Sequence, residues 1–145
     1  MNIRFVTSDD FDIWLPLWRG YQDFYQTQIA SEVTQQTWNR FLDVNEPMWC
    51  SLAEVDAHVV GLVHHIYHRS CWTSGNYCYL QDLYVDARYR AKGVGRALIE
   101  HVKQHARQQG ASRVHWLTHE TNTDAMQLYD QIAQKSGFVQ YRILL

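Results

Sequence analysis

The chain has few cysteines, no long apolar run and almost no net charge, and each of these features excludes a class of protein. Its three cysteines, Cys50, Cys71 and Cys78, are odd in number and have no CxxC spacing, so the sequence indicates neither a disulfide framework nor a zinc site. No apolar run approaches the roughly 20 residues needed to span a bilayer, and residues 1–4 do not resemble a signal peptide. We therefore expect a cytoplasmic protein with no membrane partner.

The net charge of −2 leaves no room for a broad basic surface. Binding to nucleic acid depends on clustered positive charge, so we expect no nucleic-acid partner. The 145 residues, 46% of them hydrophobic, are enough for one sizeable core, and they contain no linker, repeat or low-complexity stretch. The sequence thus predicts a single domain over residues 1–145.

Hydrophobic periodicity and turn residues predict an alternation of strands and helices. Helices are expected over about 9–28, 31–43, 94–106 and 123–136. Strands are expected over 3–6, 49–55, 58–67, 77–85, 112–118 and 138–145. Elements mixed in this way imply an α/β sandwich of about seven strands and four helices.

Three histidines, His64, His65 and His68, cluster in one of these strands. Side chains alternate between the two faces of a strand, so His64 and His68 are expected on one face and His65 on the other. A metal site with three ligands is geometrically awkward there, and we expect none.

A basic turn with two glycines follows the strand that ends at Val85, and an apolar helical pattern follows the turn. The start of a helix offers unpaired N–H groups and the positive end of the helix dipole, and Gly93 and Gly95 let an anion approach the backbone. Up to four cations surround the turn: Arg88, Arg90, Lys92 and Arg96. The pattern indicates a site for a ligand with several phosphates.

Two common phosphate motifs do not fit this turn. The phosphate loop of nucleotide hydrolases needs Gly-Lys followed by Ser or Thr, whereas this chain has Lys92, Gly93 and Val94 in that order. A dinucleotide fingerprint needs a third glycine at the position of Leu98.

The order Arg90-x-x-Gly93-x-Gly95 instead resembles the acetyl-coenzyme A pyrophosphate turn of the GNAT superfamily of N-acetyltransferases. Over most of the chain, the runs 79–85, 93–100, 114–122 and 128–130 look like the subgroup of yeast histone/polyamine and D-amino-acid acetyltransferases, which is related to diamine acetyltransferases. The resemblance implies a GNAT-like fold with a splayed central pair of strands, acetyl-CoA as co-substrate, and a homodimer formed through the C-terminal strands or a higher homo-oligomer.

The resemblance also implies which residues contact acetyl-CoA. These are Leu83, Tyr84, Val85, Arg90, Ala91, Lys92, Gly93, Val94, Gly95, Arg96, Asn122 and Tyr129. Asn122 and Tyr129 lie seven residues apart, so they face the same side of a helix about 10 Å apart along its axis. Ala91 stands where a glycine is common, which is tolerated if its φ angle is negative.

Acetyl transfer to an amine requires a neutral amine, although only about one lysine-like amine in two thousand is neutral at pH 7. Asp82 and Glu120 are the candidate general bases, with His119 behind them. Asp82 could equally form a hydrogen bond within the sheet, and Glu120 could cap the next helix. In the family a tyrosine at the position of Tyr129 commonly serves as general acid toward the thiolate, and a backbone N–H at Leu83 or Val85 polarises the carbonyl.

Five residues are expected to contact the amine acceptor: Gln81, Asp82, Glu120, Tyr25 and Trp72. Trp72, Tyr25 and Tyr21 could stack on an ammonium group. Related diamine acetyltransferases carry a glutamate where this chain has Gln81, so one anionic contact is missing. We predict acetylation of a small primary amine, by direct attack in a ternary complex. The alternatives are acetylation of protein lysines or N-termini, and a non-catalytic CoA-binding domain that serves as a sensor or in assembly.

Overall fold

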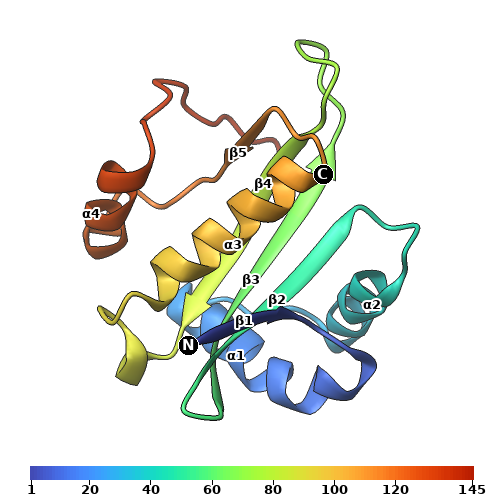
Figure 1. Ribbon diagram of the computed structural model, residues 1–145, viewed down its shortest axis with the longest axis vertical. Helices are drawn as coiled ribbons and strands as arrows, with labels where there is room; N and C mark the ends of the chain where they lie inside the picture. The colour runs from blue at the N-terminus through green and yellow to red at the C-terminus, as the bar shows by residue number, and fades with distance from the viewer.

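Five strands form one mixed sheet in the computed structural model, which describes residues 1–145 (Figure 1). The strands are β1 (Asn2–Phe5), β2 (Met48–Val55), β3 (His58–His68), β4 (Tyr77–Val85) and β5 (Arg113–His115), and they are neighbours in chain order. The first four pair antiparallel, and β5 pairs parallel to β4. A two-residue turn joins β2 to β3, and both its residues, Asp56 and Ala57, have positive φ angles, as a tight hairpin requires.

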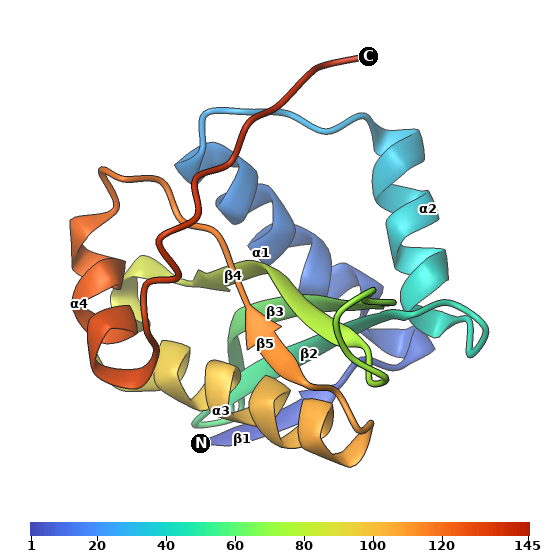
Figure 2. The same cartoon turned by 90° about the horizontal axis from the view of Figure 1, so that it is seen from above.

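Helices cover both faces of the sheet (Figure 2). They are α1 (Phe11–Phe24), α2 (Ser31–Leu42), α3 (Val94–Gln108) and α4 (Thr123–Ile132), with short 3₁₀ turns at Ser8–Asp10 and Ala87–Tyr89. The helices α1 and α2 lie on one face and α3 on the other, while α4 lies beside the start of α3. None of the helices is long and apolar enough to cross a membrane.

Two hydrophobic clusters hold the layers together. On the α3 face, Leu98 and Val102 are fully buried against Val63 of β3. On the other face, Trp14, Trp18 and Trp38 pack with Phe41 and Leu62. The six tryptophans are thus mostly core residues, although Trp72 is 81% exposed. Of the three cysteines, only Cys71 is exposed.

The strand β4 is irregular at its centre. His64 pairs with Asp82 but His65 pairs with Leu80, so Gln81 is an extra residue, a β-bulge. On the other side of β4, pairing with β5 stops at Tyr79 and His115. The two strands separate beyond that point, and one edge of β4 from Leu80 onward has no strand neighbour.

The predicted mixed α/β architecture, with a splayed central pair of strands and four helices, is confirmed. The strand count is lower than expected: β5 has three residues instead of seven, and residues 138–145 form no strand. A strand needs a neighbour for its N–H and C=O groups, and the final segment runs to a free end away from the sheet (Figure 2). The last helix ends at Ile132, earlier than the predicted residue 136.

Candidate active site

The helix α3 begins at the turn that the sequence singled out. Gly93 stands immediately before the helix with a φ angle of 82°, which suits glycine. The N–H groups of Val94, Gly95 and Arg96 come too early in the helix to have an intrahelical acceptor. A Cβ placed on Gly95 would lie 3.8 Å from Leu83 Cδ2 and 3.7 Å from Leu128 Cδ2. The start of α3 therefore lies against both β4 and α4.

Three of the four cations near this turn have no acidic partner. Arg88 is the exception, because its guanidinium donates to both carboxylate oxygens of Asp86, at 3.1 and 2.8 Å. Lys92 Nζ donates to the carbonyl oxygen of Arg88 (2.9 Å), and Arg96 Nη2 donates to the amide oxygen of Gln131 (2.6 Å). The turn thus offers three unneutralised charges for an anion rather than the four expected.

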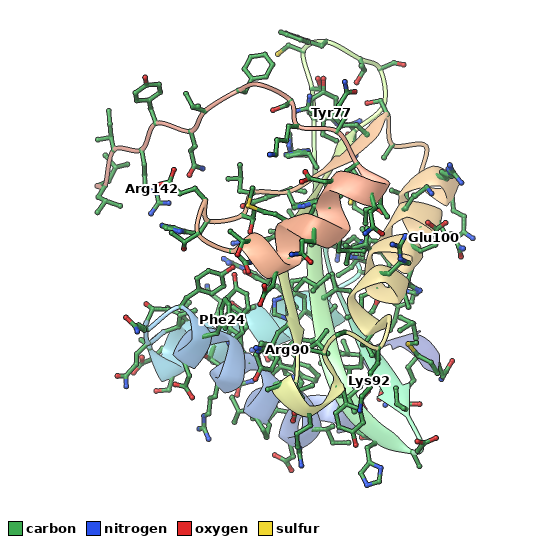
Figure 3. The ribbon with its side chains drawn as sticks, turned by 90° about the vertical axis from the view of Figure 1, so that its left-hand side faces the viewer. Phe24, Tyr77, Arg90, Lys92, Glu100 and Arg142 are labelled. Atoms are coloured by element: carbon green, nitrogen blue, oxygen red, sulfur yellow. The ribbon has the colours of Figure 1, made fainter.

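The third of these cations, Arg90, is held by the end of β4. Its Nε donates to the carbonyl oxygen of Val85 at 2.9 Å. Its guanidinium lies 5.3 Å from the ring centre of Phe24 and 5.7 Å from that of Tyr84 (Figure 3). Arg90 therefore links the turn to α1 instead of extending freely into solvent.

The backbone at Ala91 differs from the expectation. Its φ angle is +58°, in the left-handed region, so the negative φ angle under which an alanine would be tolerated here is not present. This conformation costs a residue with a Cβ roughly 1 to 2 kcal/mol. The turn keeps the glycine-like shape without the glycine.

A small pocket lies where β4 and β5 separate. It is lined by Tyr21, Tyr25, Leu80, Gln81, Leu83, Trp116, Leu117, Thr118 and Tyr129, and its volume is about 40 Å³. The ring of Tyr129 stands edge-on to Trp116, with 5.3 Å between the ring centres. Burial, and after it the nearby Tyr25, raises the pKa of the Tyr129 phenol. Tyr129 is therefore a protonated hydroxyl in the wall of the pocket at neutral pH.

A larger cleft, of about 770 Å³, lies between α3 and α4. Gly93 and Arg96 of the turn line it, as do Ile99 of α3 and Ile132 of α4. Trp116 belongs to the wall of both the cleft and the small pocket. The cleft at the start of α3 and the pocket of Tyr129 thus share Trp116 as a wall residue.

Asp82 lies behind the small pocket and is 8% exposed. Its Oδ2 lies 2.9 Å from Nδ1 of His64, and Nε2 of His64 accepts from the indole N–H of Trp14, also at 2.9 Å. Burial, and after it the charge of Asp82, raises the pKa of Tyr21 and that of Tyr25. Because both tyrosines line the pocket, the negative charge of Asp82 is felt at the pocket wall.

The structure brings together only some of the predicted site residues. Tyr25, Gln81, Leu83 and Tyr129 line the pocket. Asn122 stands at the start of α4, where its Nδ2 donates to Thr118 Oγ1 at 3.1 Å. Thr118 is itself a pocket residue.

Four predicted residues lie elsewhere. Glu120 is exposed, makes no hydrogen bond or ion pair and does not line the pocket, and Trp72 is in the exposed loop before β4. The Val85 side chain is buried in the core, and Tyr84 packs against Gly20 of α1. Only the backbone of these last two residues remains a candidate for contact with acetyl-CoA.

Sequence reasoning missed His64, Trp14 and Trp116 as site residues. The sequence raised only a metal site for His64, and it gave neither tryptophan a role in the site, although Trp116 lies in the family-like run 114–122. The strand alternation that separated His64 from His65 was the available signal, because it placed His64 on the same face as Asp82 once the two strands paired.

Comparison with known proteins gives three informative matches. The model of the acetyltransferase (GNAT) family matches residues 11–133. The D-amino-acid N-acetyltransferase HPA3 of Saccharomyces cerevisiae is 35% identical over 142 residues, which cover 97% of this chain and 88% of that protein. Thialysine N-epsilon-acetyltransferase of Caenorhabditis elegans is 33% identical over 66 residues, 46% of this chain and 41% of that protein.

A solved structure also superposes on the whole fold. The structure of AAC(6')-Iy, in complex with the bisubstrate analog CoA-S-monomethyl-acetylneamine, matches with a TM-score of 0.86 at 15% identity, over 99% of this chain and 97% of that one. At this identity the match supports the arrangement of strands and helices.

Proposed function

Because the chain belongs to the acetyltransferase (GNAT) family, as its motifs predicted, we propose that it transfers the acetyl group of acetyl-coenzyme A to the primary amine of a small molecule. Two relatives are named for small acceptors, a D-amino acid and thialysine. The observation that carries the proposal is that the start of α3 lies against β4 and α4, next to the pocket of Tyr129.

The turn has the properties that a pyrophosphate requires. The unpaired N–H groups of Val94, Gly95 and Arg96 and the dipole of α3 favour an anion. Arg90, Lys92 and Arg96 add positive charge that no carboxylate neutralises. The free edge of β4 from Leu80 onward supplies N–H and C=O groups for the extended pantetheine arm, as a neighbouring strand would.

The acceptor amine would enter the small pocket. Its volume of about 40 Å³ is small but exceeds the roughly 10–15 Å³ that one water needs, so an amino group fits. Asp82 is favoured over Glu120 as the base, because it is buried in β4 between the pocket residues Gln81 and Leu83, whereas Glu120 is exposed and does not line the pocket. The ammonium gives one proton to Asp82, directly or through water, and the neutral amine attacks the thioester carbonyl carbon.

Tyr129 would complete the transfer. As the C–S bond breaks, its hydroxyl gives a proton to the departing thiolate, and the second N–H proton of the attacking amine restores the hydroxyl through water. Asp82 returns its proton to solvent. The products are an N-acetyl amide and the free thiol of coenzyme A.

An assay of thiol release with acetyl-CoA and a panel of polyamines, amino acids and lysine analogues tests this proposal. The variant Tyr129→Phe should lower turnover by about 10²-fold or more, with the affinity for acetyl-CoA unchanged. The matched control is Tyr77→Phe, because Tyr77 is near the opposite end of β4 from Arg90 and Lys92 (Figure 3) and should leave turnover intact.

The outcomes separate the candidate functions. Binding of coenzyme A without turnover of any amine would favour a sensor or assembly domain over an enzyme. Turnover of lysine-containing peptides alone would favour a protein acetyltransferase. Failure to bind coenzyme A at low ionic strength would overturn the whole proposal.

We also propose a homodimer formed through residues 138–145. Large apolar side chains of this segment are exposed, among them Phe138 (82%), Tyr141 (92%) and Ile143 (87%). Within the chain, no strand pairs with the outer edge of β5. Residues 138–145 of a second copy could pair there and bury these side chains. Sedimentation should show a dimer that dissociates when residues 138–145 are deleted, and a monomeric full chain would refute it. A cytoplasmic location stays a prediction.

A further inference from the structure

Three buried side chains form a chain of hydrogen bonds behind the acceptor pocket. The indole N–H of Trp14 donates to Nε2 of His64 at 2.9 Å, and Nδ1 of His64 lies 2.9 Å from Oδ2 of Asp82. Trp14 is fully buried, His64 is 2% exposed and Asp82 is 8% exposed. The three residues come from α1, β3 and β4. They therefore connect the helix layer to the bulge that presents Asp82.

The indole group sets the direction of both hydrogen bonds. An indole nitrogen can only donate, so Nε2 of His64 must accept. A neutral imidazole then carries its single proton on Nδ1 and donates it to Asp82. A doubly protonated imidazolium would point a second N–H at the indole N–H. The contact with Trp14 thus fits a neutral His64 whose proton is on Nδ1.

The surroundings of His64 offer no second charge. Its ring lies 4.6 Å from that of Phe41 and 4.9 Å from that of Trp18, measured between ring centres. The nearest residue on β2 is Cys50, and burial raises the pKa of its thiol well above the ordinary value. No lysine or arginine forms an ion pair with Asp82. No lysine or arginine therefore offsets the charge of this carboxylate.

We propose that Trp14 and His64 are positioning residues that make the enzyme selective for cationic amines. His64 holds Oδ2 of Asp82, which leaves the other carboxylate oxygen to act toward the amine. Trp14 prevents His64 from becoming a cation that would neutralise Asp82. The inference rests on the proposed function, since it assigns these residues to the acceptor side of the amine acetylation.

The proton balance is simple in this arrangement. The ammonium loses one proton to Asp82, and its N–H bonding pair becomes the nucleophilic lone pair. His64 is already a donor to Asp82 and has no free nitrogen, so the proton stays on the carboxylate until solvent removes it. The role of His64 is thus to orient Asp82 rather than to carry a proton.

Two variants of His64 separate orientation from packing. In His64→Asn the amide nitrogen takes the place of Nδ1 and can still donate to Asp82. In His64→Gln the side-chain end takes the place of Nε2 and keeps only the contact with Trp14. We expect His64→Asn to stay near wild type, and His64→Gln to lower kcat/KM for the amine by about 10- to 100-fold with KM for acetyl-CoA unchanged.

Trp14→Phe tests the electrostatic half of the proposal. Without the indole N–H, His64 can take a second proton and form an ion pair with Asp82. The preference for a cationic amine over trifluoroethylamine, which is uncharged at neutral pH, should then fall by about tenfold or more. Trp38→Phe is the matched control, because Trp38 packs on Trp14 with 5.0 Å between ring centres and makes no hydrogen bond to His64.

A spectroscopic measurement needs no turnover. Nitrogen-15 NMR of the wild-type imidazole should show the proton of His64 on Nδ1, and a proton on Nε2 would overturn the inference. Equal losses in His64→Asn and His64→Gln, with both variants folded by circular dichroism, would also overturn it while leaving the proposed function intact. Absence of turnover of any amine by the wild type would instead remove the proposed function, and the positioning role with it.

Discussion

His64 and His65 are adjacent in β3, but their side chains lie on opposite faces of the sheet and have different hydrogen-bond partners. His64 faces α1, where it links Trp14 to Asp82. His65 faces α3 and is fully buried; its Nε2 lies 2.9 Å from Nδ1 of His105, and its own Nδ1 has no partner. Burial, and after it the neighbouring His105, lowers the pKa of His65 to about 3.

The difference shows how one residue type acquires two roles. On the α1 face the imidazole joins a carboxylate whose charge reaches a pocket. On the α3 face the imidazole is a neutral polar group inside an apolar layer, and the hydroxyl of Tyr67 also lies 2.8 Å from Nδ1 of His105. We therefore expect changes on the first face to alter catalysis and changes on the second to alter stability.

Asp82→Asn, on the α1 face, should give the largest of the expected effects, a loss of turnover. Asparagine keeps an oxygen that accepts from His64 but loses the negative charge and the basicity. Turnover of the amine should fall by about 10²- to 10⁴-fold, measured as steady-state kcat. The midpoint of thermal unfolding and the affinity for acetyl-CoA should change little. A variant that retains more than a tenth of the wild-type turnover would exclude Asp82 as the base.

Leu98→Ala should destabilise the protein through the α3 face of the sheet. Leu98 is fully buried in the cluster between α3 and the sheet, so truncation should lower the free energy of unfolding by about 2 to 5 kcal/mol. Urea unfolding measures this loss. The KM for the amine should stay at the wild-type value under conditions where the variant remains folded. A changed KM would show that the two faces are coupled.

Acidification should act mainly through the α3 face. The pKa of His65, about 3 when folded, is far below the unfolded value of about 6.5, so below pH 6.5 the unfolded chain binds a proton that the folded protein does not. His65 should therefore remove stability as the pH falls through 6.5 toward 3, and should remove almost none at pH 7.5 or above. Between pH 7.5 and 5.5 the loss from this residue is about 1.4 kcal/mol.

The variant His65→Gln tests how much of this loss in unfolding free energy comes from His65. Glutamine keeps a polar group near His105 but does not titrate, so urea unfolding at pH 7.5 and 5.5 should show a smaller loss than in the wild type. The lowered pKa values of His101 and His105, both caused first by burial, leave part of the loss in place. An unchanged pH dependence would argue against a neutral His65.

Ala91→Gly should give the smallest effect on stability, because Ala91 lies in the turn before α3 and in neither face of the sheet. Glycine removes the strain of the positive φ angle at this position, although it adds chain entropy to the unfolded state. The net gain in unfolding free energy should be about 0.5 kcal/mol. Thermal unfolding with and without coenzyme A measures it, and a loss of stability would contradict the strained turn.

The sequence predicted those parts of the fold that depend on local pattern. Periodic apolar residues predicted α3, and the glycines and cations predicted the turn before it. The bulge at Gln81 and the contact between Trp14 and His64 depend on how distant segments pair, so no local pattern reports them. Residues 138–145 have the composition of a strand but lack a neighbour, and Trp72 and Glu120 were chosen by residue type without knowledge of which way they face.

The distribution of cysteines has a practical consequence for the enzyme assay. Cys71 is exposed, whereas Cys50 and Cys78 are buried. A colorimetric thiol reagent should therefore titrate one equivalent of the native protein at once, as a constant background beneath the coenzyme A signal. Two further equivalents should react only when the chain opens, so the same reagent counts denatured molecules in each sample.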